Sequence, residues 1–348
     1  MTTSPTRFFA SDNASGVHPE VMAAIERANT GHALAYGHDS WTEAAESAFR
    51  HHFGPDTDVY MVFGGTGANV VALAPLVSSF QSILCADSSH LWRDECAAPE
   101  HFLGAKLVPV PSHDGKIAVD GLRRIRPIPA AHHAQPRVLS IAQPTELGTV
   151  YTLAELSALT EYARERGWLV HIDGARLANA AVSLGLPLGA FGPEAGVAAL
   201  SFGGTKNGLL GAEAVLFFHP ATRSSAPYYR KQAAQLASKM RFLAAQFTAL
   251  LGDALWQRTA AHANRMAQKL ADAIAPLDGV DIAHPVETNA VFVHMPEDVA
   301  SAVQQEMYFH VWDPEGTLVR LMTSWDTQPQ DVERFARALE SALARATR

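Results

Sequence analysis

Residues 168–176 read Trp-Leu-Val-His-Ile-Asp-Gly-Ala-Arg, a short apolar run that ends in an acid, a glycine and a base. The run at 168–172 is rich in β-branched residues, which is typical of a strand buried on both faces. The segment before it, 152–166, places leucine and alanine side chains on one face of a helix, and Gly167 favours a helix end there. A buried strand preceded by an amphipathic helix indicates a parallel sheet with helical crossovers.

The same pattern recurs along the chain and predicts the other strands of the sheet. These lie at 59–63, 82–86, 106–110, 137–142, 197–202 and 214–218. From residue 220 to about 277 the pattern is helical, with a break near residues 252–253. A smaller unit follows, with strands at 291–294 and 318–322 and helices at 299–309 and about 330–346.

These segments predict an α/β protein with a large domain, built on a mainly parallel sheet covered by helices, and a smaller C-terminal α+β domain. We expect an N-terminal arm and helix over residues 1–35, the large domain over 36–250 and the small domain over 251–348. The length of 348 residues fits about two domains. The 48% of hydrophobic residues and 18% of charged residues exclude a disordered chain.

Charge and cysteine content narrow the class of protein. The formal net charge of −8, without a long basic run, disfavours a nucleic-acid or anionic-membrane partner. Cys85 and Cys96 are too few for a disulfide framework or a four-ligand zinc site, and the 16 histidines show no H-E-x-x-H spacing, so we predict no metal site. No apolar run is long enough to span a bilayer, and residues 1–10 do not resemble a signal peptide. We therefore expect a soluble, cytoplasmic protein.

A glycine-rich turn follows the strand expected at 59–63. Residues 64–69 read Gly-Gly-Thr-Gly-Ala-Asn and lead into an apolar helix. Free backbone N–H groups, a hydroxyl group and a helix N-terminus suit an anion. The turn lacks both the Lys-Ser/Thr pair of a Walker A loop and the third glycine of a dinucleotide-binding turn, so it suits one phosphate group. The alternative is a tight turn that serves only packing.

Two ionisable side chains follow later strands. Asp173 suits a cationic nitrogen of a ligand, or alternatively caps the next helix. Lys206 lies in Gly-Gly-Thr-Lys-Asn-Gly (203–208), where poor solvation lowers the pKa of the amine and exposes a nucleophile; the alternative is an exposed loop lysine. Ligands of open α/β sheets bind beyond the carboxyl ends of the strands. The lysine, the acid and the phosphate turn together match what pyridoxal phosphate needs.

The chain also resembles a known family, most specifically in residues 171–176 and 201–208. These blocks are similar to those of the low-specificity L-threonine aldolases, which have the aspartate-aminotransferase-like fold (fold type I of the pyridoxal-phosphate enzymes). The resemblance runs through nearly the whole length, from residues 11–13 to residues 320–323. It implies pyridoxal 5′-phosphate as cofactor and a homotetramer whose active sites are shared between two subunits.

The resemblance assigns cofactor-binding residues. Lys206 corresponds to the lysine that binds the cofactor covalently, and Asp173 to the partner of its pyridine nitrogen. Residues Gly65, Thr66 and Gly67 correspond to the phosphate turn.

Further correspondences concern the ring of the cofactor and the substrate. His90 corresponds to an imidazole stacked over the cofactor ring, and Arg176 to a residue near both cofactor and substrate. Arg320 and Arg176 match arginines that hold the substrate carboxylate, with Ser11 beside them. Tyr36 matches a residue that reaches the site of a neighbouring subunit. The basic pair at 230–231 serves either a partner's phosphate group or only a solvated helix face.

Two positions depart from the family pattern: His38, in a segment that resembles Tyr-Gly-Asp-Asp, and Glu146, whose departure matters more. Many members carry Thr-His-Asn-Gly after the fourth strand, whereas residues 145–148 read Thr-Glu-Leu-Gly. Glu146 therefore replaces a histidine near the β-hydroxyl group of the substrate. We consider two roles for Glu146: a base for the hydroxyl proton, or a hydrogen-bonding residue within its own loop.

The resemblance implies a carbon–carbon lyase that cleaves L-threonine, L-allo-threonine and related β-hydroxy-α-amino acids to glycine and an aldehyde. The alternatives with the same cofactor are a β-eliminating lyase and an aminotransferase. A non-catalytic, cofactor-binding regulator is disfavoured by the acidic charge. A mononucleotide-binding protein is the remaining alternative.

Overall fold

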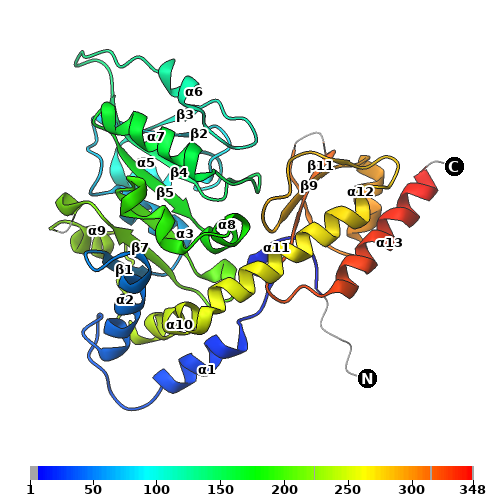
Figure 1. Cartoon of the computed structure of the whole chain (residues 1–348), viewed down its shortest axis with the longest axis horizontal. Coiled ribbons are helices and arrows are strands. Elements are labelled where there is room, and N and C mark those ends of the chain that lie inside the picture. Colours follow the sequence, from blue (N-terminus) through cyan, green and yellow to red (C-terminus); the bar gives the residue numbers. More distant parts are fainter. Residues whose placement is uncertain (1–6, 223, 314–315, 347–348) are drawn as a thin grey trace.

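The computed structural model describes residues 7–222, 224–313 and 316–346 (Figure 1). The first six residues of the expected arm, and residues 347–348 of the expected small domain, lie outside the described residues. A seven-stranded sheet in the order β1-β7-β6-β5-β4-β2-β3 forms the larger part. Its strands are β1 (Asp58–Val62), β2 (Gln81–Ala86), β3 (Lys106–Val110), β4 (Gln135–Ala142), β5 (Leu169–Gly174), β6 (Ala199–Gly203) and β7 (Glu213–Phe217).

The seven predicted strands are all present, with ends that differ by at most two residues. Strands β3, β2, β4, β5 and β6 pair in parallel with one another, whereas β7 is antiparallel to both β6 and β1. The prediction of a mainly parallel sheet is therefore confirmed. Parallel strands bring their carboxyl ends to one edge, and that edge carries the segments after β5 and β6.

Helices cover both faces of this sheet, because successive residues of each strand point to opposite faces. In β2, for example, Leu84 and Ala86 belong to one apolar core and Ile83 and Cys85 to the other. The helices are α1 (Pro19–Ala28), α2 (Ser40–Phe53), α3 (Gly65–Leu73), α4 (His90–Arg93), α5 (Ala98–Leu103), α6 (Val119–Arg123), α7 (Leu153–Glu165), α8 (Leu177–Leu184), α9 (Ala226–Gln232) and α10 (Arg241–Leu251). The first core includes residues of α2, α7, α8 and α10, and the second those of α3.

A smaller antiparallel sheet, β10-β11-β9-β8, follows with helices α11 (Leu255–Ile274), α12 (Glu297–Gln304) and α13 (Pro329–Ala346). Strands β9 (Ala290–His294) and β11 (Leu318–Met322) match the prediction. The strands β8 (Asp281–Ile282) and β10 (His310–Val311) were not predicted, because two residues are too few to show the alternation of apolar and polar residues that marks a strand.

The prediction of a helix at 299–309 is wrong at the C-terminal end of that helix. Helix α12 stops at Gln304, and the chain then turns so that Met307 and Phe309 enter the small core ahead of β10.

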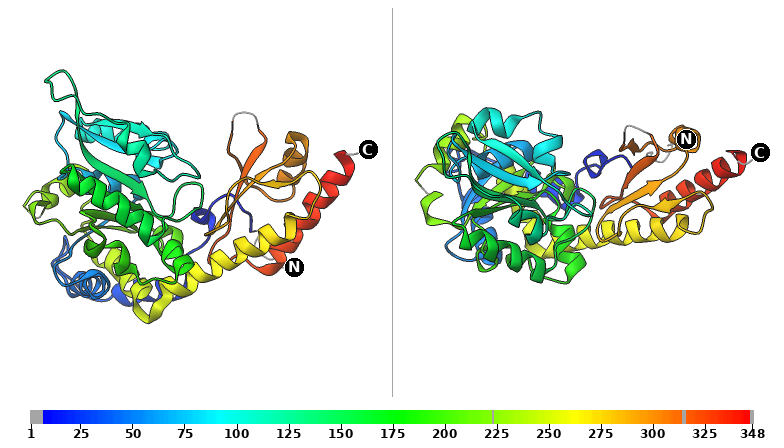
Figure 2. Two further views of the ribbon diagram at one scale, coloured as in Figure 1. Left: turned by 45° about the horizontal axis from the view of Figure 1, so that its top comes forward. Right: turned by 90° about the horizontal axis from the view of Figure 1, so that it is seen from above.

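Helix α11 connects the two parts of the molecule. Leu255, Trp256 and Ala260 pack in the core of the large sheet, whereas Leu270 and Ile274 pack in the core of the small one. Figures 1 and 2 show this helix running from the large part to beneath the small sheet. The domain limits at 35 and 250 stay a prediction, since one continuous helix contributes to both cores.

The N-terminal segment lies between the two parts. Phe9 packs in the small core and exchanges backbone hydrogen bonds with Tyr308 and Met322. The short 3₁₀-helix η1 (Asp12–Ala14) follows and lies between the two sheets in both views of Figure 2. Residues 11–14 are thereby carried to the edge where the carboxyl ends of the parallel strands meet.

Candidate active site

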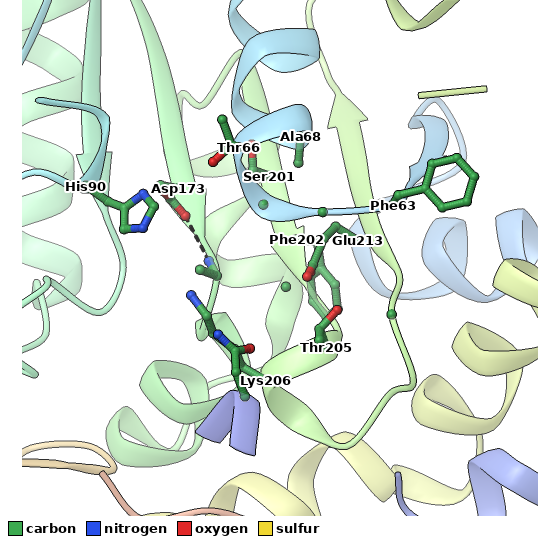
Figure 3. A pocket seen from close by; sticks show the side chains of 16 residues that line it. Phe63, Thr66, Ala68, His90, Asp173, Ser201, Phe202, Thr205, Lys206 and Glu213 are labelled. Carbon is green, nitrogen blue, oxygen red and sulfur yellow. Dashed lines mark hydrogen bonds between the residues drawn. The ribbon is translucent and has the colours of Figure 1, made fainter. Parts of the chain in front are cut away.

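A cavity of about 290 Å³ opens at the carboxyl ends of β1, β5 and β6 (Figure 3). The three strand-end features that the sequence singled out all reach it: the turn before α3, Asp173 and Lys206. The residues that line it are Asn13, Phe63, Gly64, Gly65, Thr66, Ala68, His90, Asp173, Ala175, Ser201, Phe202, Gly203, Thr205, Lys206, Gly211 and Glu213. In Figure 3, Asp173 lies beside His90, and the ring of Phe63 points away from both.

Lys206 lies in the 3₁₀-helix η4 (Thr205–Asn207), directly after β6. Two glycines make its position possible, since a Cβ at Gly203 would collide with the backbone of Ala175 and one at Gly204 would lie 2.6 Å from the carbonyl oxygen of Ala212. The positive charge of Arg176 lowers the pKa of the Lys206 amine, and burial lowers it further. Both effects favour the neutral, nucleophilic amine.

The turn that carries Lys206 rests on a buried acid. The backbone N–H of Gly204 donates to Oε2 of Glu213 at 2.7 Å, and the backbone N–H of Ala212 donates to Oγ1 of Thr205 at 3.2 Å. Burial raises the pKa of Glu213 to about 7. Sequence reasoning missed Glu213, although an acid at the start of an otherwise apolar strand is a visible signal.

Asp173 is the second-last residue of β5 and is 9% exposed. Its Oδ1 accepts the backbone N–H of Ala175 at 3.0 Å, and its Oδ2 accepts Nδ2 of Asn69 at 2.9 Å. The alternative of a helix cap is wrong, because α8 begins at Leu177 with Arg176 in the N-cap position. The carboxylate is instead oriented toward the cavity by two donors.

The glycine-rich turn forms the start of α3. Gly64 is the N-cap residue and provides no side-chain cap, so the first backbone N–H groups of the helix are available to a ligand. Gly65 and Thr66 line the cavity. Gly67 does not, and a Cβ at this position would require the end of the Gln235 side chain to shift; the predicted phosphate contact of Gly67 stays a prediction.

His90 begins α4, after β2, and lines the cavity from the side of Asp173. Its ring Nδ1 lies 2.9 Å from Oε1 of Glu95, and its backbone N–H donates to Oε1 of Glu146 at 2.8 Å. The hydrogen bond with Glu95 raises the pKa of His90.

Glu146 lies behind His90 and is not among the residues that line the cavity. Its Oε2 is buried without a hydrogen-bond partner among the described residues. Burial raises the pKa of Glu146 to about 7. Its carboxylate contacts both the backbone N–H of His90 and its own backbone, so both proposed roles of Glu146 stay predictions.

Arg176 is paired with an acid that the sequence analysis did not assign. Its Nε and one terminal nitrogen donate to the two oxygens of Asp12 at 2.6 and 2.8 Å, and Asn289 donates to the same carboxylate at 3.0 Å. The pKa of Asp12 is lowered: burial raises it, but the charge and hydrogen bonds of Arg176 outweigh burial. Since Asp12 occupies this fork of Arg176, the predicted contacts of Arg176 with substrate and cofactor stay predictions.

Arg320 lies on β11 near this pair, and its guanidinium carbon lies 4.4 Å from the centre of the Trp312 ring. Its Nε is buried without a partner among the described residues. Burial and the charge of Arg176 lower the pKa of Arg320 to about 10, so it is a cation at neutral pH. A half-buried guanidinium with an unmet donor suits a ligand carboxylate.

Two other predicted residues lie outside the cavity. Ser11 precedes Asp12 and accepts the backbone N–H of Asn13 at 3.1 Å, so it caps η1. Tyr36 is 47% exposed and does not line the cavity of its own chain.

In the pair at 230–231, the guanidinium of Arg230 lies 5.0 Å from the centre of the Tyr60 ring, so Arg230 is not on a fully solvated face.

Comparison with known proteins agrees with this arrangement. The family model described as "Beta-eliminating lyase" matches residues 9–298, and the chain belongs to that family. A Pseudomonas aeruginosa protein named low specificity L-threonine aldolase is 44% identical over 98% of this chain and 99% of its own length. Within the beta-eliminating lyase family, this chain is therefore a member of the low-specificity L-threonine aldolases. The resemblance noted in the sequence is confirmed.

Two solved structures support the fold. The threonine aldolase of Leishmania major has a TM-score of 0.89 and 28% identity, covering 96% of this chain and 98% of that one. The aspartate aminotransferase of Thermus thermophilus has a TM-score of 0.71 at 16% identity, covering 94% of this chain and 89% of that one. The predicted fold type I is therefore confirmed.

Proposed function

We propose that the cavity binds pyridoxal 5′-phosphate and that the protein cleaves L-threonine and related β-hydroxy-α-amino acids to glycine and an aldehyde. The observation that carries the proposal is the meeting of Lys206, Asp173 and the start of α3 at one cavity. The chemistry of this donor set fits the cofactor, which needs an amine for its aldehyde, an acid for its pyridine nitrogen and N–H donors for its phosphate. Family membership supports the same assignment.

When bound, pyridoxal phosphate supplies an electron sink for the bond that breaks at Cα of the substrate. The buried Lys206 amine holds the cofactor aldehyde, and the N–H groups at Gly65 and Thr66 bind its phosphate. The Asp173 carboxylate keeps a proton on the pyridine nitrogen, because an adjacent negative charge favours the protonated form.

The substrate is oriented by the residues between the two sheets. Arg320 binds its carboxylate, which turns the Cα–Cβ bond toward the required alignment. His90 faces the β-hydroxyl group, and Glu146, which accepts the backbone N–H of His90, takes up the hydroxyl proton directly or orients a water molecule that carries it.

Replacing Arg320 by lysine keeps the charge but removes the two-pronged donor. We expect KM for threonine to rise roughly tenfold, because a bidentate charged hydrogen bond is lost. Steady-state kinetics beside an Arg123→Lys control, at an exposed position on α6, measures the effect. A KM equal to that of the parent protein would identify Arg320 as a residue of the surface only.

The Glu146→Gln variant tests the proton acceptor. Glutamine can still accept the His90 N–H, so the backbone contact is kept while the titrating group is removed. A base acts when deprotonated, so activity in the parent protein should rise with pH through about 7, the pKa to which burial raises Glu146. We expect the variant to lose roughly 100-fold in kcat and to lose that limb of the pH profile. If kcat and its pH dependence are unaltered, Glu146 does not carry the proton.

A panel of substrates tests the proposed activity and its breadth. L-threonine, L-allo-threonine and 3-phenylserine should each yield glycine and the matching aldehyde from the cofactor-loaded protein. Formation of a keto acid would instead favour the alternatives, elimination at Cβ or transfer of the amine.

We also propose a homotetramer with active sites shared between subunits, supported by the exposed position of Tyr36 outside the cavity of its own chain. Light scattering coupled to gel filtration measures the mass, and a species of four chains is the expected result.

The described part of the chain holds no helix long and apolar enough to cross a membrane. The cytoplasmic location and the absence of a nucleic-acid partner stay predictions.

A further inference from the structure

A carboxylate without a role in the proposed function holds the ring of His90. Glu95 lies in the turn between α4 and α5, and its side chain is 0% exposed. Its Oε1 lies 2.9 Å from Nδ1 of His90 and accepts Nδ2 of Asn69 at 2.8 Å. Its Oε2 is buried without a partner among the described residues. Burying a charge is costly, so these contacts call for a functional explanation.

The contact with Glu95 fixes which nitrogen of His90 carries the proton. An ionised carboxylate only accepts hydrogen bonds, so Nδ1 of His90 must be protonated to bond with it. The lone pair of the neutral ring then lies on Nε2. The His90 side chain is 41% exposed and lines the cavity, and Nε2 has no partner in the described part of the chain. Nε2 is thus the nitrogen available to a ligand.

Asn69 ties this pair to Asp173. Its Nδ2 has two hydrogens and two acceptors, Oε1 of Glu95 at 2.8 Å and Oδ2 of Asp173 at 2.9 Å. One amide therefore separates two buried carboxylates and supplies each with a donor. Asn69 lies on α3, so the helix that starts at the phosphate turn also sets the position of both acids.

The backbone after Glu95 adopts a costly conformation. Cys96 and Ala97 both lie in the left-handed region, with φ of 50° and 58°. This region is strained for a residue with a Cβ, and such conformations gather where a side chain must be placed for function. The reversal occurs directly after Glu95 and allows its carboxylate to point inward, under His90.

The charged groups around His90 come from four segments. Glu95 and Asp173 favour the protonated ring, whereas Lys206 opposes it, and Glu146 faces the backbone N–H. The hydrogen bond with Glu95 is the largest of these effects and raises the pKa of His90. Removing Glu95 should therefore lower that pKa.

We propose that Glu95 is a positioning residue for the reaction: it holds His90 with a proton on Nδ1 and a lone pair on Nε2 facing the substrate, and Asn69 holds Glu95 in place. The catalytic consequence rests on the proposed function, since it assumes that His90 faces the β-hydroxyl group. The tautomer itself does not depend on that function.

The tautomer is measured on the cofactor-free parent protein by ¹⁵N NMR of labelled histidine, with His90 assigned by the signals missing in a His90→Asn variant. Above the pKa of His90, the expected spectrum has a protonated Nδ1 and an unprotonated Nε2. The reverse tautomer would overturn the proposal, and no folded Glu95 variant is needed to reach this result.

The Glu95→Gln variant adds a second test, with Glu100→Gln as the control because it makes the same change five residues along. We expect the NMR titration of His90 to move to lower pH, and kcat for threonine to fall roughly 10- to 100-fold. If titration and kcat both match the parent protein, Glu95 only fills space and the proposal is wrong. If the titration moves but no sample cleaves threonine, the proposed function fails while the contact of Glu95 with His90 stands.

Discussion

Lys206→Ala should abolish turnover of threonine, with kcat falling by roughly 10³-fold or more, because the variant loses its covalent attachment to the cofactor. The side chain is one of those that line the cavity, and alanine adds no bulk to the turn. Circular dichroism should still report a folded protein. Lys269→Ala, an exposed position on α11, is the matched control and should keep full activity.

Chemical trapping tests the same residue without relying on kinetics. Borohydride reduction of the cofactor-loaded parent protein should fix the cofactor on the peptide that contains Lys206, as read by mass spectrometry. Labelling of another lysine, or substantial activity in Lys206→Ala, would contradict the assignment.

Asp173→Asn should weaken retention of the cofactor and nearly silence the reaction. A hydrogen bond to a charged group contributes about 1.5–3 kcal/mol, which corresponds to roughly 10- to 150-fold in affinity. Asparagine has nearly the same shape, but its single oxygen can accept from only one of Ala175 and Asn69, so the loss reports the charge together with one hydrogen bond. Equilibrium dialysis against pyridoxal phosphate measures the affinity.

The control for this variant is Asp120→Asn, a change at a carboxylate that is 80% exposed and paired with Arg123. It should bind the cofactor as the parent protein does. Equal affinity in Asp173→Asn and in this control would limit Asp173 to a structural role.

Much of the fold could be predicted because burial on both faces leaves a direct mark on the sequence. Strand β5 is apolar at nearly every position until Asp173, and the helix before it carries its apolar residues on one face. Local pattern failed where elements are very short or where packing decides. The strand β8 has two residues, and the end of α12 depends on the burial of Phe309.

The site was predictable at the strand ends and less so elsewhere. Asp173 lies at the carboxyl end of β5 and Lys206 just after β6, so the sheet alone brings them to one edge. Asp12 reaches Arg176 across 164 residues, and Asn69 reaches Asp173 across 104, contacts that no local spacing reveals.

The central claim is cleavage of the Cα–Cβ bond, and the products formed from L-threonine test it most directly. The cofactor-loaded protein should release glycine and acetaldehyde in equal amounts, without 2-oxobutanoate or ammonia, and Lys206→Ala should release neither product. Formation of 2-oxobutanoate and ammonia in place of glycine would show elimination at Cβ instead and would contradict the proposed function.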